Sequence, residues 1–497
     1  MNYLPIILSA LPFVVFIYLL LVKKVTLLKT SFVTLILYTL LALFYWKMFP
    51  SFLYVSYGKG VMVAFDIFII IFGAIFFLEI LKGLKIIKNI SYYLEGISKD
   101  YRIQIIIIAW FFECFLEGTA GFGVPAAIAV PILMSIGLPP IRALVVGLLG
   151  NSTPGVFGAA GTPIKVGFAG LNTTGVPYLA SLINMVGIII PVFMLWAITK
   201  GRENRKNEFL EALPFALWSG FVFVVPSALA VSLGQEFPSI IGSIVGLIII
   251  IVSIKIGLFT PKNNLTLRED RELTKTMSAT KAFLPYGILV LFLVLGKILI
   301  GKIGITLSVG FTHVFNLFNP GFAFVLAGIV VLFIWRDKIK TLFHSARKAI
   351  KGTIAPFLVI ASMLAMVQIM VNSGNNLSGI PSAINLIAKG FTTPFLPFLA
   401  PFIGAFGGFM TGSVTVSNIM FGTLFNTAAI NLGLSISVIL SLAVVGASAG
   451  NMIALADILT AEAVAGEKNA ERQILKGVFI PCLTYLTLVG LIGLIIF

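Results

Sequence analysis

Long apolar runs, separated by short charged loops, follow one another along the whole chain. Because roughly 20 apolar residues cross a bilayer as an α-helix, each run of that length predicts one membrane span. The first run ends at Lys23-Lys24, with no basic region before it and no cleavage site after it, and so predicts a span rather than a signal peptide. The twelve predicted spans lie near residues 4–22, 27–46, 61–81, 141–160, 177–199, 213–233, 238–258, 282–301, 318–335, 352–372, 434–453 and 474–497.

Two further apolar stretches, 103–138 and 391–432, are too long for a single span. Each is interrupted by a break rich in Gly, Ser and Thr, at 117–123 in the first and 411–418 in the second. Each stretch is either two spans or a re-entrant hairpin, and in both cases the chain returns to the side that it left. The predicted fold class is an all-α polytopic membrane protein with about 12 transmembrane helices and two opposed re-entrant hairpins.

The basic residues indicate which loops face the cytoplasm, where Lys and Arg are enriched. One assignment of the loops to the two sides of the membrane places 27 of the 34 Lys and Arg residues on the cytoplasmic side and both termini outside. The basic loops are 23–29, 82–102, 200–206, 255–281, 336–351 and 468–476. We therefore expect a multi-pass protein of the cell membrane.

The two halves of the chain share a thin sequence pattern at an offset of about 295 residues. Phe115-Leu-Glu-Gly-Thr119 parallels Phe409-Met-Thr-Gly-Ser413, Gly137-Leu138 parallels Gly433-Leu434, and Gly150-Asn-Ser152 parallels Gly446-Ala-Ser448. Because the predicted hairpins enter from opposite sides, the pattern predicts an inverted-topology repeat, as in many secondary transporters. Within a single transmembrane domain 1–497, the expected parts are a first half 1–211 with hairpin 103–138, connecting helices and a cytoplasmic linker 212–281, and a second half 282–497 with hairpin 391–432.

Composition supports a lipid environment, because 59% of the residues are hydrophobic, 10% are charged and the mean hydropathy is +1.10. The net charge of +16 does not indicate nucleic-acid binding, since the basic residues lie in short loops and form no single patch. The two cysteines, Cys114 and Cys482, lie in apolar runs and support no disulfide framework. No P-loop motif occurs, which argues against ATP as the energy source.

Four breaks are predicted to unwind the helices at membrane depth, at 117–125, 150–163, 411–418 and 446–451. Unwound backbone survives there only where protein or a water-filled cavity satisfies its amides, and half-helix N-termini bring free N–H donors to such a place. An anion held there would rest on amide dipoles and hydroxyls, unless Arg142 or Lys165 reaches in. The alternative is that the breaks are kinks and close-packed helix faces. The candidate substrate-binding residues are Thr119, Gly121, Gly123, Asn151, Ser152, Thr153, Ser413, Thr415, Ser417, Asn418, Ser448 and Asn451.

Glu117 is the sharpest candidate for ion coupling, because it occupies a break. A carboxyl in a partly dehydrated cavity can bind a proton near neutral pH, as a proton symporter requires. The alternative is that the Glu117 carboxylate caps the half-helix that begins after the break, or that it does both. Glu113, one turn earlier, faces the same side and is a candidate to share the proton.

Three other charged residues in or beside apolar runs are weaker candidates for the site. Asp66 is assigned to packing or gating, and Asp457 to cation binding or to a helix cap at the cytoplasmic edge. Arg142, at a helix start, is more simply explained as a topology anchor. His313 and His344 lie in predicted loops without a predicted partner, so the sequence supports neither a metal site nor a proton relay there.

Several motifs resemble those of a known family. Ala109-Trp110 precedes Phe115-Leu-Glu-Gly-Thr-Ala-Gly-Phe-Gly-Val-Pro125, and Gly150-Asn-Ser152 precedes Phe157-Gly-Ala-Ala-Gly-Thr-Pro163. These motifs resemble the L-lactate permease family, and so do Lys59-Gly60, Asp66, Thr411-Gly-Ser413, Ser417-Asn418 and Gly450-Asn-Met-Ile453. The resemblance covers essentially the whole chain and implies transport of small 2-hydroxymonocarboxylates, lactate and glycolate, with protons. The chain departs from the family pattern where Val414 replaces an acid, Val416 a serine and Glu113 a residue that is often small.

These features lead to three hypotheses of function. The first is a proton-coupled symporter of lactate or a similar 2-hydroxymonocarboxylate, embedded in the lipid bilayer, with no enzymatic activity, cofactor or metal. The second is a sodium-coupled carrier of another carboxylate or an inorganic anion, because unwound carbonyls and hydroxyls coordinate Na⁺ well. The third, an ion channel or a redox-pump subunit, would require repeated filters or relays of His, Asp and Glu along several spans, which the sequence lacks. A homo-oligomer is compatible with all three.

Overall fold

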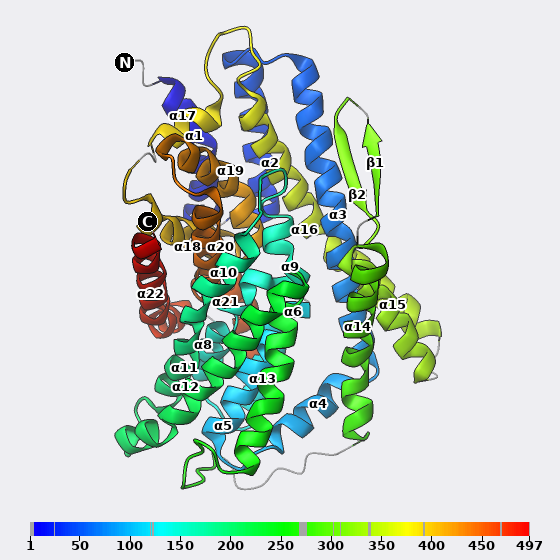
Figure 1. The fold of residues 1–497 in the computed structure, drawn as a ribbon, viewed down its shortest axis with the longest axis vertical. Helices are drawn as coiled ribbons and strands as arrows, with labels where there is room; N and C mark the ends of the chain where they lie inside the picture. The colour runs from blue at the N-terminus through cyan, green and yellow to red at the C-terminus, as the bar shows by residue number, and fades with distance from the viewer. Residues whose placement is uncertain are drawn as a thin grey trace.

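The computed structural model is a bundle of long helices that run roughly along one axis (Figure 1). It describes residues 4–23, 25–119, 121, 124–267, 276–301, 303–308, 310–335, 339–390, 393–467 and 470–496. Within these residues, nine helices are long and apolar enough to cross a membrane, and a tenth span results if the bent pair Pro140–Gly150 and Pro154–Lys165 is counted as one. The chain is therefore a multi-pass membrane protein.

The helices and strands are numbered in chain order, as in Figure 1. Up to the charged linker they are α1 (Leu4–Ile17), α2 (Leu27–Leu40), α3 (Pro50–Gly83), α4 (Ile86–Glu95), α5 (Tyr101–Ile106), α6 (Glu113–Thr119), α7 (Val124–Ser135), α8 (Pro140–Gly150), α9 (Gly158–Lys165), α10 (Val176–Ile183), α11 (Ile190–Thr199), α12 (Arg205–Ala230) and α13 (Pro238–Lys255). After it come α14 (Ala279–Ile300), β1 (Gly304–Ser308), β2 (Thr312–Asn316), α15 (Pro320–Ile334), α16 (Ile339–Asn372), α17 (Ala383–Gly390), α18 (Leu396–Thr411), α19 (Val414–Leu432), α20 (Ile436–Gly450), α21 (Leu455–Ala465) and α22 (Glu471–Ile496).

Several predicted spans differ from the helices in length. The helices α3 and α16 have 34 residues each, because both continue past their apolar segments into polar turns, and they pack side by side. Helix α15 has only 15 residues. The count of twelve spans and the orientation of the termini therefore remain predictions.

The expectation of a purely helical fold is wrong between α14 and α15, where the chain forms a two-stranded antiparallel hairpin. The β1 segment Ile305-Thr-Leu307 and the β2 segment Thr312-His-Val-Phe315 alternate β-branched, aromatic and polar residues, a pattern that fits a pleated strand. Ile305 pairs with Phe315, and Leu307 pairs with His313. The prediction from apolar runs missed the strands, because they are short and lie in the loop between two predicted spans.

The two overlong apolar stretches each fold as a pair of packed helices. Helix α5 continues through a π-helical segment, Ile107–Phe112, into α6, and α7 then packs back against α6. In the second stretch α18 and α19 pack against each other across a turn at Gly412, whose φ of 64° suits glycine. Both stretches thus break inside the predicted segments, after Thr119 and after Thr411.

The predicted break at 446–451 is displaced in the structure, because α20 runs unbroken through Gly450 and the helix unwinds only after it. Gly446 and Gly450 are close-packing residues, as are Gly404 and Gly408 on α18. A Cβ atom on any of the four would collide with a backbone carbonyl of the facing helix. Two GxxxG faces therefore interlock and bring the α18 and α20 backbones together. Here the close-packing alternative was correct.

A buried ion cluster fixes the base of α5 to α12. The Arg102 side chain has no exposed surface, and its Nη2 lies 2.7 Å from Asp100 Oδ2 while its Nη1 lies 3.1 Å from Glu211 Oε2. It also donates hydrogen bonds to the carbonyls of Glu208 and Asn263. Burial opposes this charge, but the hydrogen bonds with Asp100 and Glu211 hold the pKa of the Arg102 guanidinium above its ordinary value.

Replacing Arg102 by Met should lower the free energy of unfolding by about 3 kcal/mol or more, because Asp100 would keep a buried charge without its partner. Unfolding of the purified protein by sodium dodecyl sulfate in mixed micelles measures this change. Lys99→Met removes the same charge from an exposed neighbouring position and should leave the stability near that of the parent chain. Equal stabilities of the two variants would show that the cluster does not anchor the helices.

Candidate functional site

Residues from all four predicted break regions meet in the interior of the bundle, although these regions are far apart in the sequence. They surround a small cavity of about 20 Å³, which we call the central cavity. This volume holds about one water molecule. The residues that line it are Glu117, Gly121, Gly155, Gly158, Ala159, Thr162, Pro163, Gly412, Ser413, Val414, Thr415 and Asn451.

The predicted site residues divide into those that line the cavity and those that support it. Glu117, Gly121, Ser413, Thr415 and Asn451 line it. Gly123 lies outside the described residues. The other polar candidates lie nearby but outside the lining: Thr119, Asn151, Ser152, Thr153, Ser417, Asn418 and Ser448. Sequence reasoning missed several lining residues that lack a polar side chain, although they fall within or beside the predicted breaks: Gly155, Gly158, Ala159, Pro163, Gly412 and Val414.

The break after α8 is the most distorted backbone of the site. A short 3₁₀ turn, Pro154–Phe157, separates α8 from α9, and the two helices are bent by 50°. Three consecutive residues then adopt left-handed conformations, with φ of 41° at Ala159, 54° at Ala160 and 79° at Gly161. For the two alanines such a conformation costs about 1–3 kcal/mol each, and it is typically found at binding and switching sites.

The carbonyls that this break frees are bound by side chains from other helices. Ser448 Oγ of α20 donates to the Ser152 carbonyl, and Asn418 Nδ2 of α19 donates to the Pro163 carbonyl at 2.9 Å. Ser239 and Asn184 donate to the Pro154 and Thr153 carbonyls at 2.8 and 2.9 Å.

Two of the predicted substrate ligands, Ser448 and Asn418, thus satisfy backbone groups instead of facing the cavity. Ser417 likewise donates to the Gly404 carbonyl of α18 at 2.9 Å. Thr119 donates within its own helix to Phe115.

The beginning of α19 points its free backbone donors toward the cavity. Ser413 is the N-cap residue and accepts a hydrogen bond from the Val416 N–H at 3.3 Å. The first residues of the helix, Val414 and Thr415, line the cavity. Among the described residues the Thr415 hydroxyl has no hydrogen-bond partner. A helix start of this kind favours an anion.

Glu117 is the carboxyl that faces the cavity. It lies in the last turn of α6, and its side chain is buried. Its Oε1 faces Gly158, and its Oε2 has no hydrogen-bond partner among the residues that the structure describes. Glu117 therefore lies in the helix that ends at the break, and capping of the next half-helix by its carboxylate stays a prediction.

Two further buried carboxyls lie within electrostatic range of Glu117. Glu113, one turn earlier, is fully buried, faces Gly150 of α8, and has no described partner for either oxygen. Asp457, in the first turn of α21, lies beside Gly412 on the far side of the α18–α19 turn, and its Oδ2 is also without a described partner. No Lys, Arg or His is found among the described residues that line the central cavity.

Two remaining candidates lie away from the cavity. Arg142 donates to the carbonyls of Ile198 and Lys200, at 3.2 and 2.7 Å, and so binds the C-terminal end of α11. Asp66 lies on α3, where its Oδ2 is 3.1 Å from His313 Nε2 of β2. His313 therefore has a partner, contrary to expectation, because the β-hairpin folds over α3.

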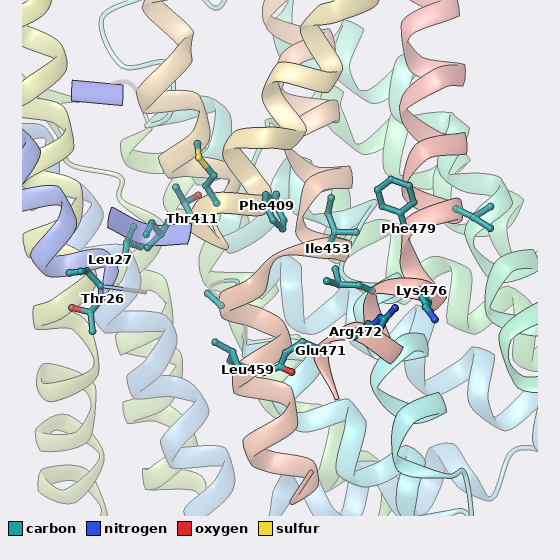
Figure 2. Close-up of a pocket in the computed structure, with 16 residues that line it drawn as sticks. Thr26, Leu27, Phe409, Thr411, Ile453, Leu459, Glu471, Arg472, Lys476 and Phe479 are labelled. Atoms are coloured by element: carbon teal, nitrogen blue, oxygen red, sulfur yellow. The ribbon is translucent and has the colours of Figure 1, made fainter. Parts of the chain in front are cut away.

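A large hollow of about 1370 Å³ lies against the tip of α18. Figure 2 shows Phe409 and Thr411 at this tip, between the start of α2 at Thr26 and Leu27 on one side and α21 and the beginning of α22 on the other. A second hollow of about 500 Å³ shares Thr411 with it and shares Gly412 and Ser413 with the central cavity. The α18–α19 turn is therefore a thin partition between the central cavity and these hollows.

Comparison with known proteins agrees with this architecture. The chain matches the family model for L-lactate permease over residues 5–303 and 300–497. It is 29% identical over 472 residues to a putative L-lactate permease of Haemophilus influenzae, covering 84% of each chain, and 29% identical over 372 residues to an L-lactate permease of Streptococcus iniae, covering 69% of this chain and 73% of that one. A glycolate permease of Escherichia coli strain K12 is 30% identical over 239 residues, covering 47% of this chain and 41% of that one. The chain thus belongs to the L-lactate permease family and is a transporter rather than an enzyme.

Proposed function

We propose that this chain carries lactate or a similar small 2-hydroxymonocarboxylate, together with a proton, across the cell membrane. The observation that supports the proposal most directly is the convergence of the predicted break regions on one cavity lined by Glu117, a carboxyl whose Oε2 has no hydrogen-bond partner among the described residues. The names of the relatives, L-lactate and glycolate permease, supply the substrate class.

The carboxylate of the substrate is held by helix-end donors rather than by a basic side chain. The N-terminal turn of α19 and the hydroxyls of Ser413 and Thr415 face the cavity. Amide dipoles at a helix start bind anions without a formal positive charge. We assign the 2-hydroxyl group of the substrate to Thr162 and Asn451, which also line the cavity.

Coupling follows from the charges that one small cavity can hold. An anionic substrate and an ionised Glu117 would place two like charges side by side in a site without a described cation, which is costly. Binding a proton to Glu117 removes this repulsion and leaves a donor for the substrate. The substrate anion and the proton therefore enter the cavity together.

Transport requires the site to open alternately to the two sides, since a cavity of about 20 Å³ is too small for a 2-hydroxyacid. The paired helices α6–α7 and α18–α19 act as opposed re-entrant hairpins of an inverted repeat, with both termini outside. The matching ends of α8 and α20 support this symmetry: each ends at a glycine followed by an asparagine, Asn151 and Asn451, and both side-chain oxygens lack a described partner.

Uptake of labelled L-lactate into proteoliposomes tests the proposal. An inwardly directed proton gradient should drive accumulation, a protonophore should abolish it, and replacing sodium by choline should leave it unchanged. Lactate uptake that ignores the proton gradient and depends on sodium would replace this proposal by the sodium-coupled alternative, and no uptake at all would refute it.

Glu117→Gln should retain lactate–lactate exchange but reduce gradient-driven accumulation by roughly 10- to 100-fold, because the amide cannot bind the coupling proton. The size of this loss is taken from the cost of an intramembrane charge, at least ~2.5 kcal/mol. Glu79→Gln is the matched control, since Glu79 also lies on a long helix but pairs with Lys82 and Lys348, at 3.1 and 3.0 Å. Accumulation by Glu117→Gln at the level of this control would exclude Glu117 as the proton site.

Gly158→Ala should reduce lactate uptake strongly without unfolding the protein. The backbone at Gly158, with φ of −61° and ψ of 155°, is allowed for alanine, but the added Cβ would collide with Glu117 Oε1 and displace the carboxyl. Gly287→Ala in α14 adds the same methyl group to open space and should transport like the parent chain. The measurement is the initial rate of lactate uptake by both variants, normalised to the amount of folded protein, and equal rates would contradict the prediction.

A further inference from the structure

A second polar hollow, of about 540 Å³, lies beneath the β-hairpin and beside α3. Figure 1 shows the hairpin alongside the upper part of α3. We call this hollow the hairpin vestibule; its charged lining residues are Lys59, Asp66, Lys165 and His313, and amides such as Asn316 and Asn372 complete its polar surface. None of these residues lines the central cavity.

The charges of the hairpin vestibule do not cancel. Asp66 Oδ2 lies 3.1 Å from His313 Nε2, and its single negative charge offsets at most one of the two lysine charges in the lining. Lys165 is 3.8 Å from Glu236, but that carboxylate is bound more closely by Lys297, at 3.1 Å. The half-buried Lys59 has no hydrogen bond or ion pair with any described residue. Positive charge is therefore left over at Lys59 and Lys165.

Two helices lead from this vestibule to the central cavity. On α9, Thr162 and Pro163 line the cavity and Lys165, at the end of the same helix, lines the vestibule. On α19, Thr415 lines the cavity and Thr423, about two turns later, lines the vestibule. The vestibule is thus the neighbouring compartment along both helices.

We propose that the hairpin vestibule is a second binding site, at which Lys59 and Lys165 hold a small monocarboxylate anion on its way to or from the central cavity. The inference rests on the proposed function and adds a site to it. The central cavity has no described cation that would attract an anion from a distance, whereas an unpaired ammonium in a walled hollow raises the local concentration of anions. A strongly hydrated lysine gives weak, rapidly exchanging binding, which suits a passing substrate.

The test is the concentration dependence of lactate uptake into cells that lack their own lactate carrier and express this chain. Lys59→Gln should raise KM by roughly 3- to 10-fold at low ionic strength with little change in Vmax, and added salt should shrink the difference. Lys59→Arg, which keeps the charge, should restore the parent KM. Lys47→Gln removes an equal charge from an exposed residue just before α3 and should behave like the parent chain.

Three results would overturn the inference. These are a parent-like KM for Lys59→Gln at both ionic strengths, a loss confined to Vmax that Lys59→Arg shares, and an equal rise of KM for Lys47→Gln.

Binding to the purified protein separates this inference from the proposed function. If the parent chain does not transport lactate but acetate or lactate raises its melting temperature more than that of Lys59→Gln, the vestibule site stands and the proposed function fails. If neither anion distinguishes the two proteins, the vestibule site fails too.

Discussion

The structure depends on one constraint, that backbone groups released by a helix break inside a membrane must find partners within the protein. The break after α8 releases the carbonyl of Ser152, and the end of α9 releases that of Pro163; both are bound by side chains from the second half of the chain, Ser448 and Asn418. The break is therefore stable only when the two halves are assembled. Side chains of the second half thus help to form the cavity, because they bind backbone groups of the unwound segment in the first half.

Close packing of the helices brings these side chains within hydrogen-bond distance of the carbonyls. The interlocked glycines of α18 and α20 remove side-chain bulk from the contact and hold Gly412 and Asn451 beside the residues of α8 and α9. A larger residue at Gly450 would push the helices apart and carry Asn451 away from the cavity. Small residues here set the position of the polar ones, so a site without a basic side chain still has defined geometry.

Hydropathy was sufficient to find most helices and the regions of the breaks, because lipid imposes a single strong rule on sequence. It could not show which polar groups face the cavity. Ser448 and Asn418 read as ligands, yet they bind carbonyls that lie 296 and 255 residues away in sequence, a pairing that only tertiary structure reveals. Gly158 was not among the predicted site residues, because only the folded structure shows that Glu117 occupies the space left by its missing side chain. The contact of His313 with Asp66 was missed because it depends on an unpredicted β-hairpin.

The placement of charge follows from what coupling demands. A lysine inside the central cavity would bind the substrate anion whether or not a proton had arrived, and the anion would then cross alone. Under the proposed function, a cavity whose one described charged lining residue is Glu117 would accept an anion when Glu117 is neutral and reject it when Glu117 is ionised. The lysines proposed to attract anions lie instead in the hairpin vestibule, Lys165 at the far end of α9 from Gly158 and Lys59 on α3. In the proposed mechanism the anion is attracted in the hairpin vestibule and admitted in the central cavity, and only its admission depends on the proton.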